Sequence, residues 1–158
     1  MVFAVPLPDG SFGLAQAVDA MMVNIIYVAL FSDRFPGLPQ STVAPRTSSA
    51  VALSATWRQH LNRGDWPSIG VAPPVFKKAQ FPAERFALSG YVGAKHYDAG
   101  ILADLLAAYH GLIPWNGMHD ESYYDHFLLP GRKRPATALV LGAAERDAYR
   151  RDHLGVGA

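Results

Sequence analysis

Histidine is the residue type in this sequence best suited to catalysis or metal binding, and six histidines occur among 158 residues. Their spacing includes neither an H-E-x-x-H pair nor an H-x₃₋₅-H pair, the patterns that place two imidazoles on one zinc ion. His119 and His126 are seven residues apart, which on one helix separates them by about 10 Å, too far for a shared metal ion. The sequence therefore predicts neither a metal site nor a bound cofactor.

Two histidines lie close to an aspartate, and a carboxylate can orient an imidazole for acid–base chemistry. His96 is followed two residues later by Asp98, and His119 is followed directly by Asp120. If these four side chains converged, the chain could be a small metal-dependent or acid/base hydrolase. Asp98 also fits the start of a helix, where its carboxylate would accept from first-turn amides. Serine-elbow and phosphate-loop chemistry are not predicted, because G-x-S-x-G and G-x-G-x-x-G do not occur.

Aromatic residues in the C-terminal half indicate another kind of site, a surface for a protein partner. Tryptophan, tyrosine and arginine bury much area in interfaces and still offer a polar group. We interpret Tyr124 and Phe127 as core residues of a short helix, whereas Trp115 is expected in an exposed turn. The residues predicted to contact a partner are Trp115, His119, Asp120, Tyr123 and Arg132.

Composition excludes several classes of protein. Half of the residues are hydrophobic and 17% are charged, so the chain can bury a sizeable core. The net charge of +1 gives no reason to expect nucleic acid as a partner, and no apolar run reaches the roughly 18 residues that suggest a membrane span. The absence of cysteine and of a secretory signal pattern favours the cytoplasm. A homodimer is compatible with this composition.

The first third of the sequence predicts three consecutive antiparallel strands. Alternating apolar residues favour strands at residues 3–7 and 12–18, joined by a tight turn at Asp9-Gly10. A run of β-branched and aromatic residues favours a third strand at 23–31. Gly13 marks a bulge or a close backbone approach, and Trp66 is expected to cover the core. Further strands are expected at residues 50–56, 69–71, 75–78 and 136–141.

Helices are predicted mainly after residue 94. Apolar residues from Ile101 to Tyr109 recur at helical spacing, so a helix is expected over residues 99–110, ended by Gly111. Shorter or more polar helices are expected at residues 57–62, after Asp120 and over 143–153. The predicted class is α+β: one domain of residues 1–158, mainly β over 1–80 and mainly α over 94–158. Its N-terminal twisted antiparallel sheet is expected to be barrel-like and to pack against C-terminal helices.

Three segments of the N-terminal half together resemble the Immunity protein 26 family. They are the opening VFAVPLPDGSFGLAQAV, a strand-like VALF shortly afterwards and the later HLNRGDWPSIG. The resemblance covers about residues 2–75, with Met1-Val2 in place of the expected Gly-Asp and Ala15 in place of a second glycine. The matching positions are Phe3, Val5, Pro6, Leu7, Asp9, Gly10, Gly13, Gln16, Val18, Trp66, Ile69 and Gly70.

The resemblance implies a bacterial, cytoplasmic protein of a polymorphic-toxin or contact-dependent inhibition system. Such a protein binds a cognate toxin and protects its producer without catalysis. Because the matched residues fit a common sheet, we expect the partner-specific surface outside them, on residues 113–127 together with Arg132.

Overall fold

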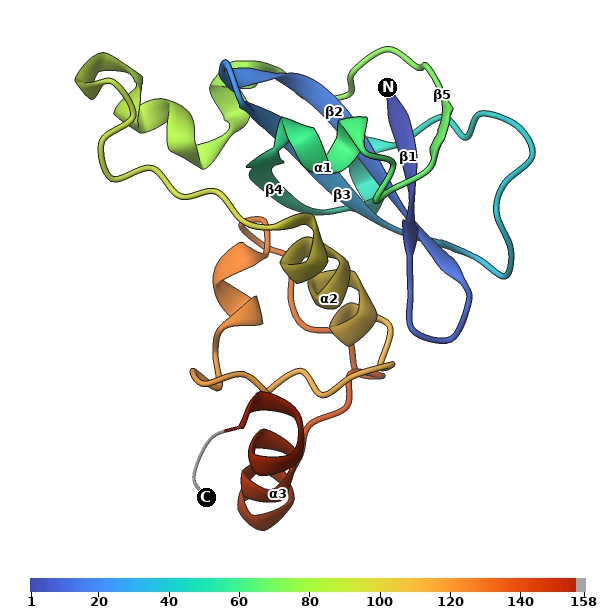
Figure 1. Cartoon of the computed structure of the whole chain (residues 1–158), viewed down its shortest axis with the longest axis vertical. Coiled ribbons are helices and arrows are strands. Elements are labelled where there is room, and N and C mark those ends of the chain that lie inside the picture. Colours follow the sequence, from blue (N-terminus) through green and yellow to red (C-terminus); the bar gives the residue numbers. More distant parts are fainter. Residues whose placement is uncertain (156–158) are drawn as a thin grey trace.

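Five antiparallel strands form the first half of the molecule in the computed structural model, which describes residues 1–155 (Figure 1). The predicted strands at 3–7, 12–18, 23–31, 50–56 and 69–71 are confirmed, with the second and third reaching residues 22 and 35. β4 and β5 are the two edges of the sheet. In the spatial order β4-β3-β2-β1-β5, the strands are β1 (Val2–Pro6), β2 (Phe12–Met22), β3 (Ile25–Phe35), β4 (Ala50–Trp57) and β5 (Ser68–Gly70).

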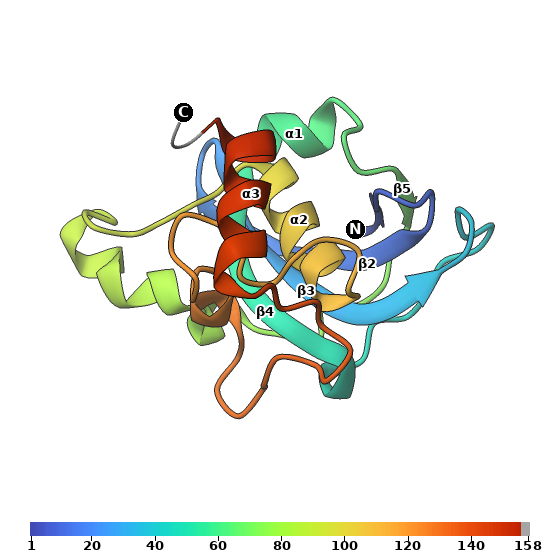
Figure 2. The same cartoon turned by 90° about the horizontal axis from the view of Figure 1, so that it is seen from below.

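Most of the helices follow the sheet in the chain, which confirms the α+β class. The α-helices are α1 (Arg58–Asn62), α2 (Ala99–Tyr109) and α3 (Ala143–Leu154), each close to its predicted range. Figures 1 and 2 show α2 between the sheet and α3. No helix within residues 1–155 is long and apolar enough to cross a membrane. Short 3₁₀ helices are η1 (Thr47–Ser49), η2 (Lys78–Gln80), η3 (Pro82–Ser89) and η4 (Tyr124–Phe127).

Two of the expected strands are wrong. Residues 75–78 bury Phe76 against the sheet and then enter η2, so they cover the sheet instead of extending it. Residues 136–141 contribute only one isolated bridge, between Leu139 and Pro114. The Asn116 side chain donates to the Leu141 carbonyl and accepts from its N–H, both at 2.9 Å. A side-chain amide thus takes the place of a neighbouring strand.

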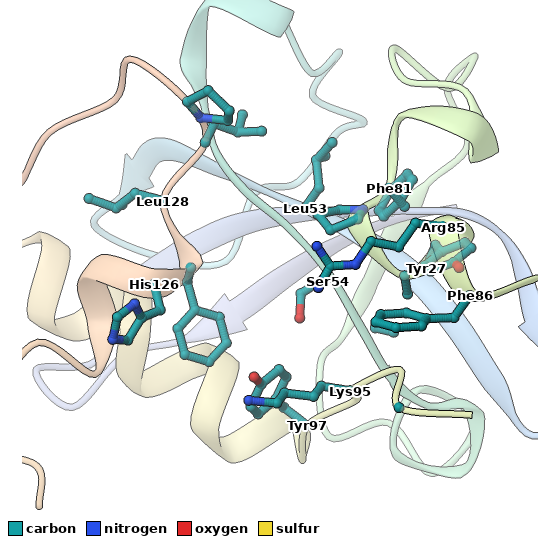
Figure 3. Close-up of a pocket in the computed structure, with 17 residues that line it drawn as sticks. Tyr27, Leu53, Ser54, Phe81, Arg85, Phe86, Lys95, Tyr97, His126 and Leu128 are labelled. Carbon is teal, nitrogen blue, oxygen red and sulfur yellow. The ribbon is translucent and has the colours of Figure 1, made fainter. Parts of the chain in front are cut away.

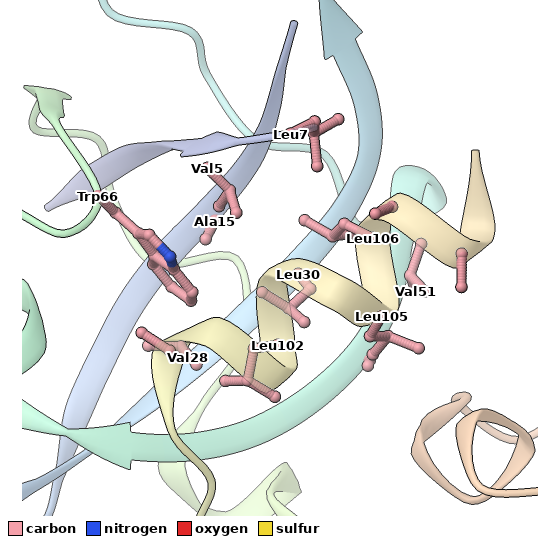
Figure 4. Close-up of a cluster of buried hydrophobic side chains, with 14 of the residues drawn as sticks. Val5, Leu7, Ala15, Val28, Leu30, Val51, Trp66, Leu102, Leu105 and Leu106 are labelled. Atoms are coloured by element: carbon pink, nitrogen blue, oxygen red, sulfur yellow. The ribbon is translucent and has the colours of Figure 1, made fainter. Parts of the chain in front are cut away.

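Helix α2 covers one face of the sheet. Val28 and Leu30 of β3 face this side and pack with Leu102, Leu105 and Leu106 in one buried cluster (Figure 4). Trp66 joins the same cluster with 2% of its surface exposed, which confirms its predicted core position. The leucines recur at helical spacing, which explains why this helix is predictable from sequence.

The opposite face of the sheet is covered by the segment that follows β5. Tyr27, Ala29 and Phe31 alternate with the residues that face α2, so they point to this second side. Phe76 and Phe81 pack against them, and the Tyr27 and Phe81 rings stack with centroids 4.5 Å apart. Burial on both faces accounts for the unbroken apolar run in β3.

Gln16 ties the covering segment to the sheet. Its side chain is fully buried, and its Nε2 donates to the carbonyls of Ala72 and Pro73 at 3.1 and 3.0 Å. Its Oε1 accepts from the Val75 N–H at 3.2 Å. A buried amide that satisfies three backbone groups fixes where this irregular segment crosses β2.

The turn at Gly10 provides a test of the predicted hairpin. Gly10 has a φ of +84° and no neighbour within 4 Å of an added Cβ, so only backbone strain opposes a side chain there. Gly10→Val is expected to lower the free energy of unfolding by about 1–2 kcal/mol. Gly37→Val is the control, because Gly37 has equal space and no positive φ. Equal urea unfolding curves for the two variants would contradict the assigned turn.

Gln16→Leu tests the buried amide. The change leaves the Ala72 and Pro73 carbonyls and the Val75 N–H without their side-chain partner. Unfolding in urea should show a loss of about 1–3 kcal/mol, the usual cost of unpaired buried polar groups. Gln59→Leu, on the exposed side of α1, should change stability far less. A Gln16→Leu variant as stable as the parent would show that the segment is held by apolar packing alone.

Candidate functional site

Trp115 is a core residue, so its predicted role as an exposed anchor is wrong. Only 1% of its surface is exposed, and its ring packs 5.6 Å from that of Tyr124. Its backbone N–H donates to the Leu139 carbonyl at 2.7 Å, and its indole Nε1 donates to Asp125 at 3.2 Å. The turn that carries Trp115 folds inward under α2, where burial of the large apolar ring is favourable.

The other four predicted contact residues have different surroundings. His119 and Asp120 are exposed, and His119 Nδ1 lies 3.1 Å from an Arg150 nitrogen. Tyr123 is half-buried, with its ring packed against that of Phe127. The Arg132 guanidinium donates to the Ser48 carbonyl at 2.8 Å. Of the five predicted contact residues, Trp115 is the one that is buried.

The four residues of the hydrolase alternative also have separate partners. His96 packs edge-on against Trp57, with ring centroids 4.5 Å apart. An Asp98 oxygen lies 3.3 Å from His60 Nε2, and an Asp120 oxygen lies 3.4 Å from His126 Nε2. Asp98 occupies the predicted N-cap position of α2, but its side chain makes no capping hydrogen bond. Within residues 1–155, no three His, Asp or Glu side chains are grouped to hold a metal ion.

A network centred on His60 was missed by the sequence analysis. His60 Nδ1 lies 2.9 Å from an Asp65 oxygen, and Nε2 lies 3.3 Å from Asp98. Arg63 holds Asp65 with two nitrogens, at 3.0 and 2.6 Å. The network joins α1 to the start of α2, across 38 residues of sequence. The local His60–Asp65 spacing was visible in the sequence, but the contact with Asp98 depends on tertiary structure.

A cleft with a volume of about 280 Å³ lies beside β4 (Figure 3). Its floor includes Leu53, Ser54 and Ala55 of β4. The walls come from η3, from residues 93–97 and from residues 126–130. The apolar side chains in the walls include Phe81, Phe86, Phe127 and Leu128, and the basic ones are Arg85, Lys95 and His126.

The nearby carboxylate of Glu84 is engaged by two tyrosines rather than by the cations. The hydroxyls of Tyr27 and Tyr91 donate to the same Glu84 oxygen at 2.8 and 2.7 Å. Burial, followed by the Glu84 contact, raises the pKa of Tyr27, and the hydrogen bond to Glu84 raises the pKa of Tyr91. Both phenols therefore stay protonated near neutral pH and keep donating.

Two cations of the cleft are not neutralised by an acidic neighbour. None of the ion pairs found in residues 1–155 involves Arg85 or Lys95. The Arg85 guanidinium lies over the Phe86 ring, 4.7 Å from its centroid, and extends toward Ser54. A cleft with apolar walls and unpaired cations is suited to an anion that also carries an apolar group.

No protein-family model, curated protein or solved structure matches the chain in the three comparisons. The resemblance to the Immunity protein 26 family therefore depends on the quoted residues of the N-terminal half.

The Asp65 carboxylate gives a pH test of the His60 network. Its hydrogen bond to Arg63, assisted by His60, lowers its pKa from 3.8 to about 2. Because the folded-state pKa is below the unfolded one, ionised Asp65 stabilises the fold above about pH 4. That contribution disappears as the pH falls toward 2. Asp65→Asn should therefore lower the urea midpoint at pH 6 but not near pH 2.

Asp152→Asn is the control for this test, because Asp152 is exposed on α3 and lies outside the ion pairs described above. Its urea midpoint should follow that of the parent at both pH values. An Asp65→Asn difference that is equally large at both pH values would contradict a role for the ionised carboxylate.

Proposed function

We propose that this chain is an immunity protein that binds a cognate bacterial toxin in the cytoplasm and neutralises it without catalysis. The observation that carries the proposal is the cleft beside β4, where Arg85 and Lys95 lie among aromatic walls and form no ion pair with another residue of the described range 1–155. Such a surface offers both charge and apolar area to a partner protein.

The residues that carry the family resemblance have structural roles. Asp9 and Gly10 form the first turn, Gln16 anchors the segment after β5, and Trp66 fills the core. Most of the cleft walls lie beyond residue 75, outside the range of the resemblance. A shared scaffold with a separate recognition surface suits a family whose members would each meet a different toxin.

Part of the originally predicted surface borders the cleft. Asp120 contacts His126, and Tyr123 packs on Phe127, and both His126 and Phe127 line the cleft. The proposed contact surface thus excludes the buried Trp115 and is centred on η3 and η4. The separate partners of His96, Asp98, His119 and Asp120 give the hydrolase alternative no specific support.

Growth protection tests this function. A candidate toxin domain, sought among the genes that neighbour the one for this chain, would be induced in a bacterial host, with and without co-expression of the chain. We expect co-expression to raise survival by at least about a hundredfold, because blocking a catalytic toxin requires a tight complex. An inactive toxin variant provides the control for expression burden. Equal killing with and without the accumulated chain would contradict the proposal.

Mass spectrometry of the neutralised toxin separates binding from catalysis. A binding protein leaves the covalent mass of the toxin unchanged and elutes with it as a stable complex in size-exclusion chromatography. Cleavage or modification of the toxin would instead support the hydrolase alternative.

A further inference from the structure

The cleft beside β4 is held open by backbone contacts to the sheet edge. On one side the Tyr97 N–H donates to the Ala55 carbonyl at 2.9 Å, and on the other the Leu129 N–H donates to the Val51 carbonyl at 3.0 Å. Both wall segments are thereby fixed to the same strand, four residues apart. A cleft with walls fixed in this way exists before a ligand arrives, which reduces the entropic cost of binding.

One part of the cleft is apolar. Phe81 is held in place by stacking on Tyr27, and Phe127 is packed against Tyr97 with centroids 4.6 Å apart. Phe86 and Leu128 complete this lining. The volume of about 280 Å³ is at the lower end for small-molecule pockets and is suited to one or two side chains.

The charged part of the cleft selects an anion. His126 already has Asp120 as its neighbour, which leaves Arg85 and Lys95 as the cations that can meet a ligand. Stacking on Phe86 restricts the orientation of the Arg85 guanidinium, and a guanidinium can hold a carboxylate with two parallel hydrogen bonds.

We propose that this cleft binds an acidic peptide segment in which Asp or Glu lies next to an aromatic or branched aliphatic residue. The carboxylate meets Arg85 and Lys95, and the apolar side chain enters between Phe86 and Phe127. This inference deepens the proposed function, because it gives the chemistry of the toxin segment that the immunity protein would hold. A nucleotide is a poorer match, since the sequence lacks a glycine-rich loop whose amides could hold phosphates.

Peptide selection tests the cleft without any knowledge of the toxin. A random peptide library displayed on phage would be selected against the purified chain. Enriched peptides would then be titrated by fluorescence polarisation against the parent and against Arg85→Glu/Lys95→Glu. The matched control is Lys133→Glu/Arg151→Glu, which changes the net charge equally at exposed residues outside the cleft. Circular dichroism would establish that both double variants fold.

We expect enriched peptides to pair an acidic residue with a neighbouring aromatic or aliphatic one. Their affinity should fall by at least about tenfold in Arg85→Glu/Lys95→Glu, and it should change much less in the control. The inference is overturned if no such consensus appears, if the cleft variant binds like the parent, or if ATP displaces the peptide from the parent. Failure of growth protection would refute the toxin proposal alone, because peptide binding is measured independently of the toxin.

Discussion

The packing of helix α2 on the sheet is the interaction on which the rest of the fold depends. A Cβ at Gly13 would lie 2.9 Å from Cδ1 of Leu106, closer than ordinary packing allows. The missing side chain leaves room for the end of the Leu106 side chain, and Leu102, Leu105 and Leu106 complete the buried cluster. The helix in turn positions Asp98 at one end for the His60 network and directs the chain at its other end toward the turn of Trp115.

The second face of the sheet has a different kind of cover, made by irregular chain rather than by a long helix. Residues 71–77 of this segment belong to no helix or strand, so side-chain hydrogen bonds help to hold the segment on the sheet. Gln16 does so at residues 72–75, and the Tyr27–Glu84–Tyr91 hydrogen bonds do so at η3. The cleft lies where this cover meets β4, and Arg85 and Lys95 are there beside the half-buried rings of Phe86 and Phe127.

Sequence patterns correctly predict those elements in which the residues' own preference for a turn, strand or helix matches the pattern of buried positions. The Asp9-Gly10 turn, the alternating strands and the leucine spacing of α2 are of this kind.

The predictions fail where residues far apart in the sequence determine the local structure. Trp115 lies in a turn, yet the bridge between Pro114 and Leu139 and the neighbouring helix bury its ring. The apolar run at residues 136–141 has strand composition but meets the Asn116 side chain instead of a partner strand. The cleft combines segments separated by up to about a hundred residues. The spacing of residues within any one segment cannot predict that these segments come together.

The occupied edge of β4 also bears on how the chain behaves at high concentration. Unpaired strand edges are templates on which further copies of a protein can add strands and grow into aggregates. Here Tyr97 and the 128–129 segment already take hydrogen bonds along β4, and the opposite edge, β5, spans only three residues. A homodimer would thus have to use another surface. A protein with edges of this kind can accumulate to a high concentration with little tendency to add strands from further copies of itself.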